Sequence, residues 1–303
     1  MIYLQSFDLP SNEKESGFFS VEKFPTYYAT LYPFQIFPAK GLSHIDFDDI
    51  TIFSGGNGSG KSTLLNVLCE RLGLKREAPF NKTALYDNYV QFVHETMIPL
   101  SREQQRELMD VSRIITSDDV FNHILEVRDR NSNIDFKRDV ILEQRMRYRY
   151  DPDSRPREIN LEDTESIRKF SEYADMTRAS LSASGYVKKH LGLNERTYSN
   201  GENGFKYFTD AIKPGGLYLL DEPENSLSAE LQTELADFLL GMARAYQCQF
   251  IISSHSPFIL SIPYARIYDM DSFPVHTCKW TELPNIKLFH EFFRIHDSEF
   301  FED

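Results

Sequence analysis

Gly55-Gly56-Asn57-Gly58-Ser59-Gly60-Lys61-Ser62 is the stretch that decides how the rest of this 303-residue sequence is interpreted. It fits the pattern G-x-x-x-x-G-K-[ST], in which glycines let successive backbone N–H groups converge on phosphate oxygens without a Cβ in the way. In such a loop Lys61 reaches the β and γ phosphates, and Ser62 binds Mg²⁺ through its hydroxyl. We therefore predict that residues 55–62, with Thr63 beside them, bind ATP and Mg²⁺. The alternative is a glycine-rich turn that matches by chance.

The residues on either side of the loop favour phosphate binding over a chance match. Residues 50–53 (ITIF) form a short apolar run that is typical of a buried strand. After the loop, residues 62–72 place apolar side chains at helical spacings, and Gly73 is well placed to end that helix. Phosphate binding at a helix N-terminus requires a strand, a loop and a helix in this order.

A second motif, LYLLDEPE at residues 217–224, supplies two carboxylates after an apolar run. Asp221 and Glu222 would then lie at the carboxyl end of a buried strand, where open α/β sheets bind their ligands. We predict that Asp221 holds Mg²⁺ through water and that Glu222 orients and polarises the water that attacks the γ phosphate. Alone, the motif could be an acidic turn before Pro223; beside the glycine loop it predicts a catalytic pair.

The composition is that of a folded, acidic protein. Apolar residues make up 41% of the chain, and the formal net charge is -13. This balance argues against a uniformly basic surface for nucleic acid, because phosphate contacts need Lys and Arg gathered on one face. The three cysteines have no spacing typical of zinc sites or disulfides, so we expect reduced thiols and a cytoplasmic location. No stretch approaches the roughly 20 apolar residues of a membrane span.

The order of the expected elements predicts an α/β fold. Residues 27–53 are rich in Tyr, Phe and Ile, and we interpret them as short strands of an N-terminal antiparallel part. Residues 217–220, 229–246 and 249–254 are interpreted as a strand, an amphipathic helix and a strand, which implies a parallel sheet. Residues from about 100 to 196 are polar and helical in pattern, and we expect them to form an inserted helical subdomain.

Three further segments resemble parts of the ABC-class ATPases. Residues 198–202 (YSNGE) resemble the signature loop L-S-G-G-Q/E, with Tyr for Leu and Asn for the first Gly. Residues 225–228 (NSLS) resemble the D-loop, with Ser228 where the family has Asp, and His255 matches the switch histidine that contacts the γ phosphate. The spacings of these segments from Asp221 and Glu222 are typical of the family. The resemblance implies a P-loop NTPase fold with an ABC-ATPase-type sheet core, forming a single ATPase domain over residues 1–303.

The same resemblance implies a composite site in a homodimer that forms on ATP binding. In the family, the signature loop of one protomer completes the nucleotide site of the other. Ser199 and Gly201 would therefore contact the γ phosphate bound by a second copy, while Glu222 and His255 would be catalytic. Hydrolysis would then open the dimer.

Two family features are left open by the sequence. The Q-loop glutamine could be Gln91, or residues 115–119 (ITSDD) could mark the strand end at which Ser or Asp replaces it. The aromatic residue that stacks on adenine could be Tyr32, Phe34 or Phe37, although each is also suited to a core.

The segments DEPENSLS and SSHSP resemble soluble relatives such as RecF, RecN, the SMC proteins and bacterial predicted AAA-type ATPases, some of them from phage-defence operons. The middle of the chain lacks the sustained heptads of an SMC coiled coil. Three functions stay open. They are an ATP-driven clamp or switch on nucleic acid in DNA repair or phage defence, a regulatory ATPase that controls a protein effector such as a nuclease or toxin, and, less favoured, a transporter's nucleotide-binding subunit.

A group of basic residues with neighbouring tyrosines motivates the nucleic-acid hypothesis, because such residues suit phosphate contact and base stacking. Its basic members are Lys137, Arg138, Arg145, Arg147, Arg149, Arg155 and Arg157, and the tyrosines are Tyr148 and Tyr150. The alternative is a solvated face whose arginines pair with nearby Asp and Glu residues.

Overall fold

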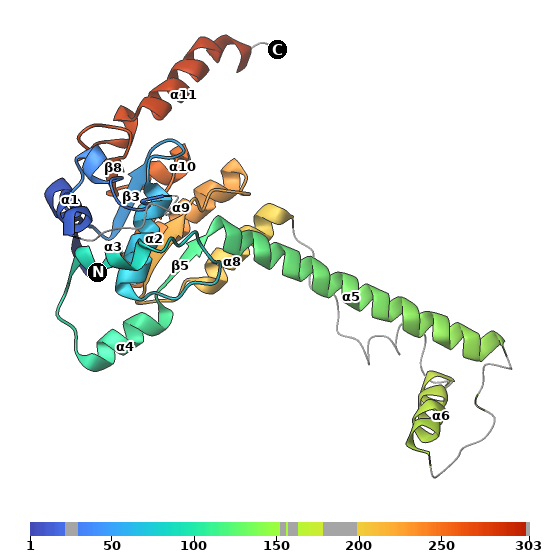
Figure 1. Cartoon of the computed structure of the whole chain (residues 1–303). Helices are drawn as coiled ribbons and strands as arrows, with labels where there is room; N and C mark the ends of the chain where they lie inside the picture. Colours follow the sequence, from blue (N-terminus) through green and yellow to red (C-terminus); the bar gives the residue numbers. More distant parts are fainter. Residues whose placement is uncertain (22–29, 152–155, 157–162, 178–198, 301–303) are drawn as a thin grey trace. The chain divides into compact units, whose positions relative to one another are not determined.

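The computed structural model describes residues 1–21, 30–151, 156, 163–177 and 199–300 (Figure 1). The chain divides into two compact units, Met1–Phe121 with Ser199–Asp303, and Asn122–Tyr198. The first unit contains two sheets and the glycine loop. In the second unit, the structure describes the greater part of α5 (Ser117–Tyr150) and α6 (Thr164–Thr177). Among the described residues, no helix combines the length and the apolar character that crossing a bilayer requires.

The larger sheet of the first unit carries the glycine loop, and its strand order is β5-β6-β7-β3-β8-β9. Neighbouring strands from β5 to β8 run parallel, and β9 runs antiparallel to β8. The strands are β3 (Ile50–Ser54), β5 (Arg113–Thr116), β6 (Leu217–Asp221), β7 (Gln249–Ser253), β8 (Arg266–Asp269) and β9 (His276–Thr277). The parallel α/β core predicted from the sequence is therefore confirmed.

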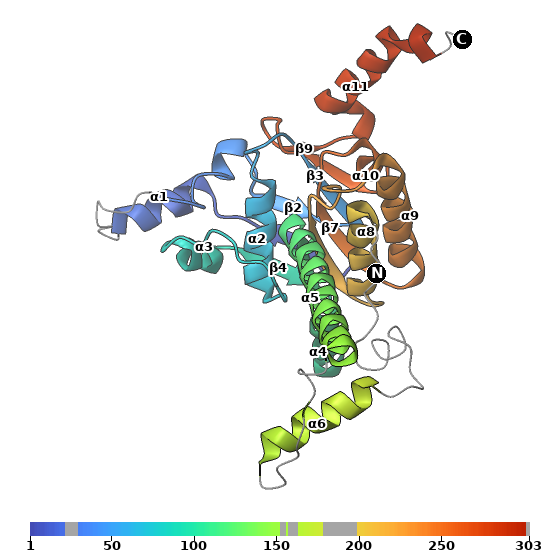
Figure 2. The same ribbon diagram turned by 90° about the vertical axis from the view of Figure 1, so that its right-hand side faces the viewer.

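Helices cover both faces of this sheet, and Figure 2 shows α2 (Lys61–Leu72) and α9 (Ala229–Ala245) on opposite sides of its strands. Covered on both faces, β3 and β7 are buried along their whole length, which explains their continuous apolar runs. As predicted, Gly73 ends α2, with φ of 65° and its N–H donated to the carbonyls of Cys69 and Glu70. The first unit also contains α1 (Asn12–Val21), η1 (Pro38–Lys40), α3 (Tyr86–Phe92), α4 (Arg102–Val111), α8 (Asn200–Ala211), α10 (Pro257–Leu260), η3 (Trp280–Glu282), α11 (Pro284–Ile295) and η4 (Asp297–Phe300).

The smaller sheet has the order β2-β1-β4 and is antiparallel, as expected for the N-terminal part. Its strands are β1 (Leu4–Asp8), β2 (His44–Asp46) and β4 (His94–Met97). The side chain of Gln249, fully buried at the start of β7, joins the two sheets. It accepts hydrogen bonds from the N–H groups of Tyr3 and Leu4, both at 2.8 Å, and donates to the carbonyls of Leu4 and Asp48. Because its polar atoms are satisfied, this buried amide fixes β1 against the larger sheet.

The expectation of strands from residue 27 onward is wrong for residues 30–43. Residues 32–37 form turns and Pro38–Lys40 forms η1, so the first strand of this region begins only at His44. Pro33 and Pro38 have no N–H to donate to a strand ladder, and Pro38 instead occupies the start of η1. The aromatic residues of this segment pack into the core rather than alternate along a strand. Residues 27–29 lie outside the described residues.

The range predicted for the insertion includes a strand of the larger sheet. Arg113–Thr116 forms β5 and pairs in parallel with β6, and its two isoleucines are buried. Residues 115–119 were offered as a possible strand end, but a four-residue strand gives too short an apolar run for its full extent to be recognised by pattern. The second compact unit begins only at Asn122. That residues 1–303 form one ATPase domain with a helical insertion stays a prediction.

His44 makes a pH-dependent contact within the smaller sheet. Its Nδ1 lies 2.6 Å from Asp8 Oδ1, and its Nε2 lies 3.1 Å from Asp46 Oδ1. The hydrogen bond with Asp8, supported by Asp46, raises the pKa of His44 above its ordinary value, although burial acts in the opposite direction. The folded state thus holds the imidazole proton more tightly than the unfolded state. This stabilisation is fully present below about pH 6.5 and is lost as the pH rises through the folded-state pKa.

We expect His44→Gln to remove this pH dependence. The wild-type Tm should fall between about pH 6 and about pH 8 by more than the Tm of the variant, and the difference should be small because His44 is half exposed. His276→Gln, at an exposed position on β9 in the other sheet, is the control. Parallel curves of Tm against pH for the wild type and His44→Gln would contradict this role of His44.

Candidate nucleotide-binding site

The glycine loop connects β3 to α2 and encloses a cavity of about 490 Å³, lined by residues 57–63 together with Tyr32, Ile36 and Glu222. Gly58 and Gly60 have φ values of 79° and 94°, a backbone conformation that favours glycine. A Cβ on Gly60 would also lie 3.2 Å from Ile36 Cγ2. The loop is therefore curved around the N-terminus of α2, where backbone N–H groups and the helix dipole favour an anion.

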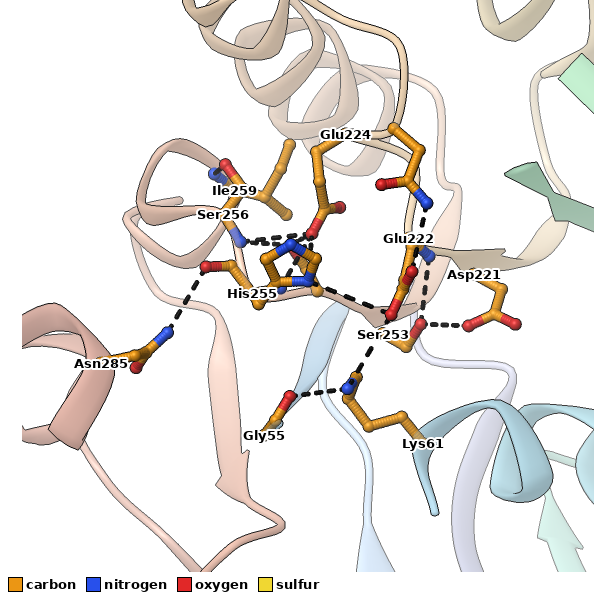
Figure 3. Close-up of polar contacts among 12 residues, drawn as sticks. Gly55, Lys61, Asp221, Glu222, Glu224, Ser253, His255, Ser256, Ile259 and Asn285 are labelled. Carbon is orange, nitrogen blue, oxygen red and sulfur yellow. Dashed lines mark hydrogen bonds and ion pairs between the residues drawn. The ribbon is translucent and has the colours of Figure 1, made fainter. Parts of the chain in front are cut away.

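Lys61 places a positive charge inside this curve. Its side chain is only 4% exposed, and its Nζ donates to the carbonyl oxygens of Gly55 at 2.6 Å and Gly56 at 3.1 Å. The same Nζ lies 4.0 Å from Glu222 Oε1 (Figure 3). The positive charge of Lys61 thus lies between the glycine loop and Glu222.

Asp221 and Ser62 bring two hard oxygen donors together. Ser62 Oγ donates to Asp221 Oδ1 at 3.0 Å, and the hydroxyl of Ser253, opposite Asp221 on β7, donates to the same oxygen. Burial raises the pKa of Asp221, and the Glu222 charge adds to this, whereas Ser253, Ser62 and Lys61 lower it. A cation would stabilise a carboxylate that burial makes costly to ionise. Carboxylate and hydroxyl oxygens also fit Mg²⁺, which binds few protein ligands besides phosphates and water.

Glu222 has an unusual backbone conformation. Its φ is 50°, in the left-handed region that residues other than glycine rarely adopt. Its N–H donates to the carbonyl of Ser253 at 3.0 Å and to Ser253 Oγ at 3.1 Å, and Asn225 Nδ2 donates to Glu222 Oε2 at 3.1 Å. Strain of this kind is kept where the surrounding structure over-determines it, as at functional sites. Here it directs the carboxylate to the cavity of the glycine loop.

His255 follows β7 and lies beside two carboxylates. Its Nδ1 is 3.4 Å from Glu224 Oε1 and 4.0 Å from Glu222 Oε1, and its side chain is half exposed. Figure 3 shows the ring near both glutamates. It also lines a cavity of about 460 Å³ with Gly55, Gly56 and Asn57. The fold thus brings Lys61, Asp221, Glu222 and His255 together at the carboxyl ends of β3, β6 and β7.

The signature residues Ser199 and Gly201 lie at the start of α8. Ser199 is the N-cap of this helix: its Oγ accepts from the Glu202 N–H at 3.2 Å, and its own N–H donates to Glu202 Oε2 at 2.8 Å. Ser199 is exposed, and neither Ser199 nor Gly201 is among the described residues that line the loop cavity of the same chain. Tyr198 lies outside the described residues.

Gly201 also has a packing role. A Cβ there would lie 2.9 Å from Leu231 Cδ1 and 3.3 Å from the carbonyl oxygen of Ser226, so the signature segment lies against residues 225–228. Ser228, which stands where the D-loop usually has Asp, is the N-cap of α9 and accepts from the Leu231 N–H at 3.4 Å. This hydroxyl therefore has a local structural role.

The position beside Asp221 is filled by residues 116–118. Thr116 is opposite Asp221 in the β5 to β6 register, and Thr116, Ser117 and Asp118 line a cavity of about 370 Å³ with it. Gln91 lies exposed on α3 and does not line this cavity. The geometry favours the second alternative for the Q-loop, with Ser or Asp in place of glutamine.

Of the three aromatic candidates for adenine stacking, only Tyr32 reaches the loop cavity. Its hydroxyl donates to Thr63 Oγ1 at 3.2 Å. Phe34 and Phe37 are 3% and 0% exposed within the hydrophobic core, so their ring faces are unavailable to a ligand. The turns that replace the expected strands are what direct these two rings inward.

Sequence reasoning missed three residues that shape the site. Ser253 bonds to both Asp221 and Glu222, Glu224 binds the His255 segment, and Asp271 accepts a hydrogen bond from the Gly56 N–H at 2.7 Å. The sequence held a signal for two of them. Serines end the apolar run QFIISS, which could have pointed to Ser253, and the second glutamate of DEPE is Glu224. Asp271 follows β8 without any local motif.

A glycine loop between β3 and α2, an acidic pair at the end of β6 and a histidine after β7, the strand that lies between β6 and β3, have the arrangement of a P-loop NTPase fold with an ABC-ATPase-type sheet core. Residues 207–261, which include Asp221, Glu222 and His255, match the family model "AAA domain, putative AbiEii toxin, Type IV TA system". A comparison with curated proteins finds no match.

Several solved structures are similar to this chain. The SMC head domain with an extended coiled coil bound to the C-terminal domain of ScpA, from Pyrococcus furiosus, is 14% identical with a TM-score of 0.43, covering 96% of this chain and 100% of that chain. The SMC head domain from Thermotoga maritima is 11% identical with a TM-score of 0.36, covering 92% and 99%. An ATP-binding cassette in a dimeric post-hydrolysis state, bound to ADP and Pi, is 13% identical with a TM-score of 0.35, covering 78% and 88%.

Proposed function

We propose that the protein binds Mg-ATP at residues 55–63 and hydrolyses it. The observation that carries this proposal is the convergence of Lys61, Asp221 and Glu222, with Lys61 Nζ 4.0 Å from Glu222 Oε1 and Ser62 Oγ 3.0 Å from Asp221 Oδ1. Lys61 would bind the β and γ phosphates, and Ser62 and Asp221 would hold Mg²⁺. Glu222 would orient the attacking water and polarise it. Mg²⁺ would neutralise charge on the phosphates.

The proposed site is completed by a second copy of the chain. Ser199 is exposed at the N-terminus of α8, where the helix dipole favours an anion. Because Ser199 and Gly201 do not line the cavity of their own chain, the γ phosphate they contact would be bound by the partner. ATP binding would thus form a homodimer with two composite sites, and hydrolysis would open it.

The proposed dimer would act as an ATP-driven switch or clamp in DNA repair or phage defence. The basic group on α5 gives only part of the support expected from the sequence, because Arg138 pairs with Asp135 at 2.5 Å and Arg147 with Glu143 at 3.1 Å. Arg155, Arg157 and the side chain of Arg149 lie outside the described residues.

This pairing favours a second candidate, a regulatory ATPase whose partner is a protein effector such as a nuclease or toxin. The name of the matching family model refers to a toxin of a toxin–antitoxin system, which also supports a protein effector as the partner. A transporter subunit is the least supported candidate. A cytoplasmic location stays a prediction.

The test is steady-state ATP hydrolysis with Mg²⁺ at low salt, with and without duplex DNA, single-stranded DNA and RNA. We expect basal phosphate release that EDTA abolishes. Stimulation of several-fold that is lost when Lys137 and Arg145 are replaced by Ala would support the clamp, because phosphate contacts depend on such charges. An unchanged rate, with capture of a protein in the ATP state, would support the effector. Absence of hydrolysis under every condition would refute the enzyme.

A further inference from the structure

Glu224 is a buried carboxylate to which the proposed hydrolysis assigns no role. It is 5% exposed, two residues after Glu222 in the turn that follows β6. Its Oε1 accepts hydrogen bonds from Ser254 Oγ at 2.8 Å, from the His255 N–H at 2.8 Å and from the Ser256 N–H at 3.2 Å (Figure 3). Three donors on one oxygen fix the segment after β7, and with it the backbone that carries the His255 ring.

The same oxygen also approaches the ring itself. Glu224 Oε1 lies 3.4 Å from His255 Nδ1, whereas the nearest oxygen of Glu222 lies 4.0 Å away. Glu224 Oε2 is buried and finds no hydrogen-bond partner among the residues that the structure describes. Burying an unpartnered carboxylate oxygen is costly, so its presence calls for a role beyond holding backbone N–H groups. An amide oxygen could accept those backbone bonds without bringing a negative charge into the protein.

We propose that Glu224 is the positioning residue of His255. Its negatively charged Oε1, 3.4 Å from Nδ1, offsets the positive charge of a ring protonated on both nitrogens, and the Nε2–H of that ring can donate to the γ phosphate of ATP bound at the glycine loop. Nδ1 lies closer to Glu224 Oε1, at 3.4 Å, than to Glu222 Oε1, at 4.0 Å, which leaves the Glu222 carboxylate more available to the attacking water. This inference rests on the proposed ATP hydrolysis and adds to it the residue that controls the switch histidine.

The other charged groups near the ring agree with a role for Glu224 in positioning His255 and a role for Glu222 in activating water. Glu222 lies between His255 and Lys61, with its Oε1 4.0 Å from both His255 Nδ1 and Lys61 Nζ. Asp269 and Asp271 line the same cavity as His255, and Asp271 is bonded to the Gly56 N–H. Among these carboxylates, Glu224 has the shortest ion-pair distance to the ring.

The first test separates positioning from structure. We expect Glu224→Gln to lower kcat roughly 10- to 100-fold while KM for ATP and Tm stay near their wild-type values, because Gln can accept the backbone bonds but carries no charge. His255→Ala should lower kcat at least as much. The double variant should be no slower than His255→Ala alone, since Glu224 acts through that ring. Glu230→Gln, an exposed carboxylate on α9, is the matched control.

Two results would overturn the proposal. Wild-type kcat in Glu224→Gln, combined with a lowered Tm in Glu224→Ala, would make Glu224 a backbone clamp only. Independent, multiplying losses in the double variant would mean that Glu224 does not act through His255.

A second measurement does not depend on hydrolysis. NMR of ¹⁵N-histidine-labelled protein without ATP, with the His255 signals identified by His255→Ala, should show the proton on Nδ1 in the wild type and a shift toward Nε2 in Glu224→Ala, which has no side-chain oxygen to accept from Nδ1–H. The same tautomer in both proteins would refute the positioning role even if ATP is hydrolysed. The expected difference in a protein that does not hydrolyse ATP would instead refute the proposed function and leave the contact between Glu224 and His255 intact.

Discussion

Glu222→Gln should reduce kcat for ATP hydrolysis by about 10³-fold, because an amide cannot polarise the attacking water as a carboxylate does. ATP binding should persist, since the Gln oxygen can still accept the hydrogen bond from Asn225 Nδ2 and the glycine loop is untouched. With ATP retained, the composite dimer should accumulate. The measurements are phosphate release and the molar mass by light scattering in saturating Mg-ATP, with Glu230→Gln as the charge-matched control.

Each measurement can contradict a different part of this prediction. Hydrolysis near the wild-type rate would remove Glu222 from the catalytic role. A variant that stays monomeric in saturating Mg-ATP would show that the site is not completed by a second copy, whatever its hydrolysis rate.

Lys61→Ala should weaken ATP binding by about 100-fold in Kd, or about 2.8 kcal/mol. The substitution removes a cation that is 4% exposed within the loop, and it also removes the hydrogen bonds to the carbonyl oxygens of Gly55 and Gly56 that hold the loop before ATP binds. Calorimetric titration with Mg-ATP measures the change. Lys14→Ala, at an exposed position on α1, is the control. A Kd within twofold of the wild type would refute phosphate binding by this loop.

The two variants should separate binding from chemistry. Glu222→Gln is expected to bind ATP without hydrolysing it, whereas Lys61→Ala is expected to lose both at ATP concentrations near the wild-type Kd. The same loss of binding in both variants would indicate that Glu222 acts mainly through the shape of the loop, to which it is linked by its contact with Lys61.

Features that depend on neighbouring residues in the chain could be predicted from the sequence. The glycines at 58 and 60 specify a loop with positive φ, the leucine spacing after it specifies α2, and Gly73 ends that helix. The runs at β3, β6 and β7 are mostly apolar because helices cover both faces of the sheet. The order of these elements along the chain predicted the parallel sheet and placed the binding site at the carboxyl ends of its strands.

Prediction of secondary structure was less accurate where an aromatic residue could belong either to a strand or to a turn that packs into the core. The aromatic residues around Phe34 and Phe37 were assigned to strands, but they form turns whose rings fill the core. A strand end at residues 115–119 was only one of two alternatives for the Q-loop, so residues 116–118 could not be placed beside Asp221 until the sheet order was known. Local pattern does not show which element will bury a given side chain.

The sequence by itself determined the class of the fold and the residue types of the phosphate loop and acidic pair, because these depend on local backbone conformation and on short apolar periods. Only the tertiary structure decided which groups meet across the sheet: Ser62 with Asp221, Lys61 with Glu222, and Glu224 with the His255 segment. These contacts join elements that are far apart in the chain, and the strand order β6-β7-β3, which sets them, is fixed by packing between those elements rather than by any one of them.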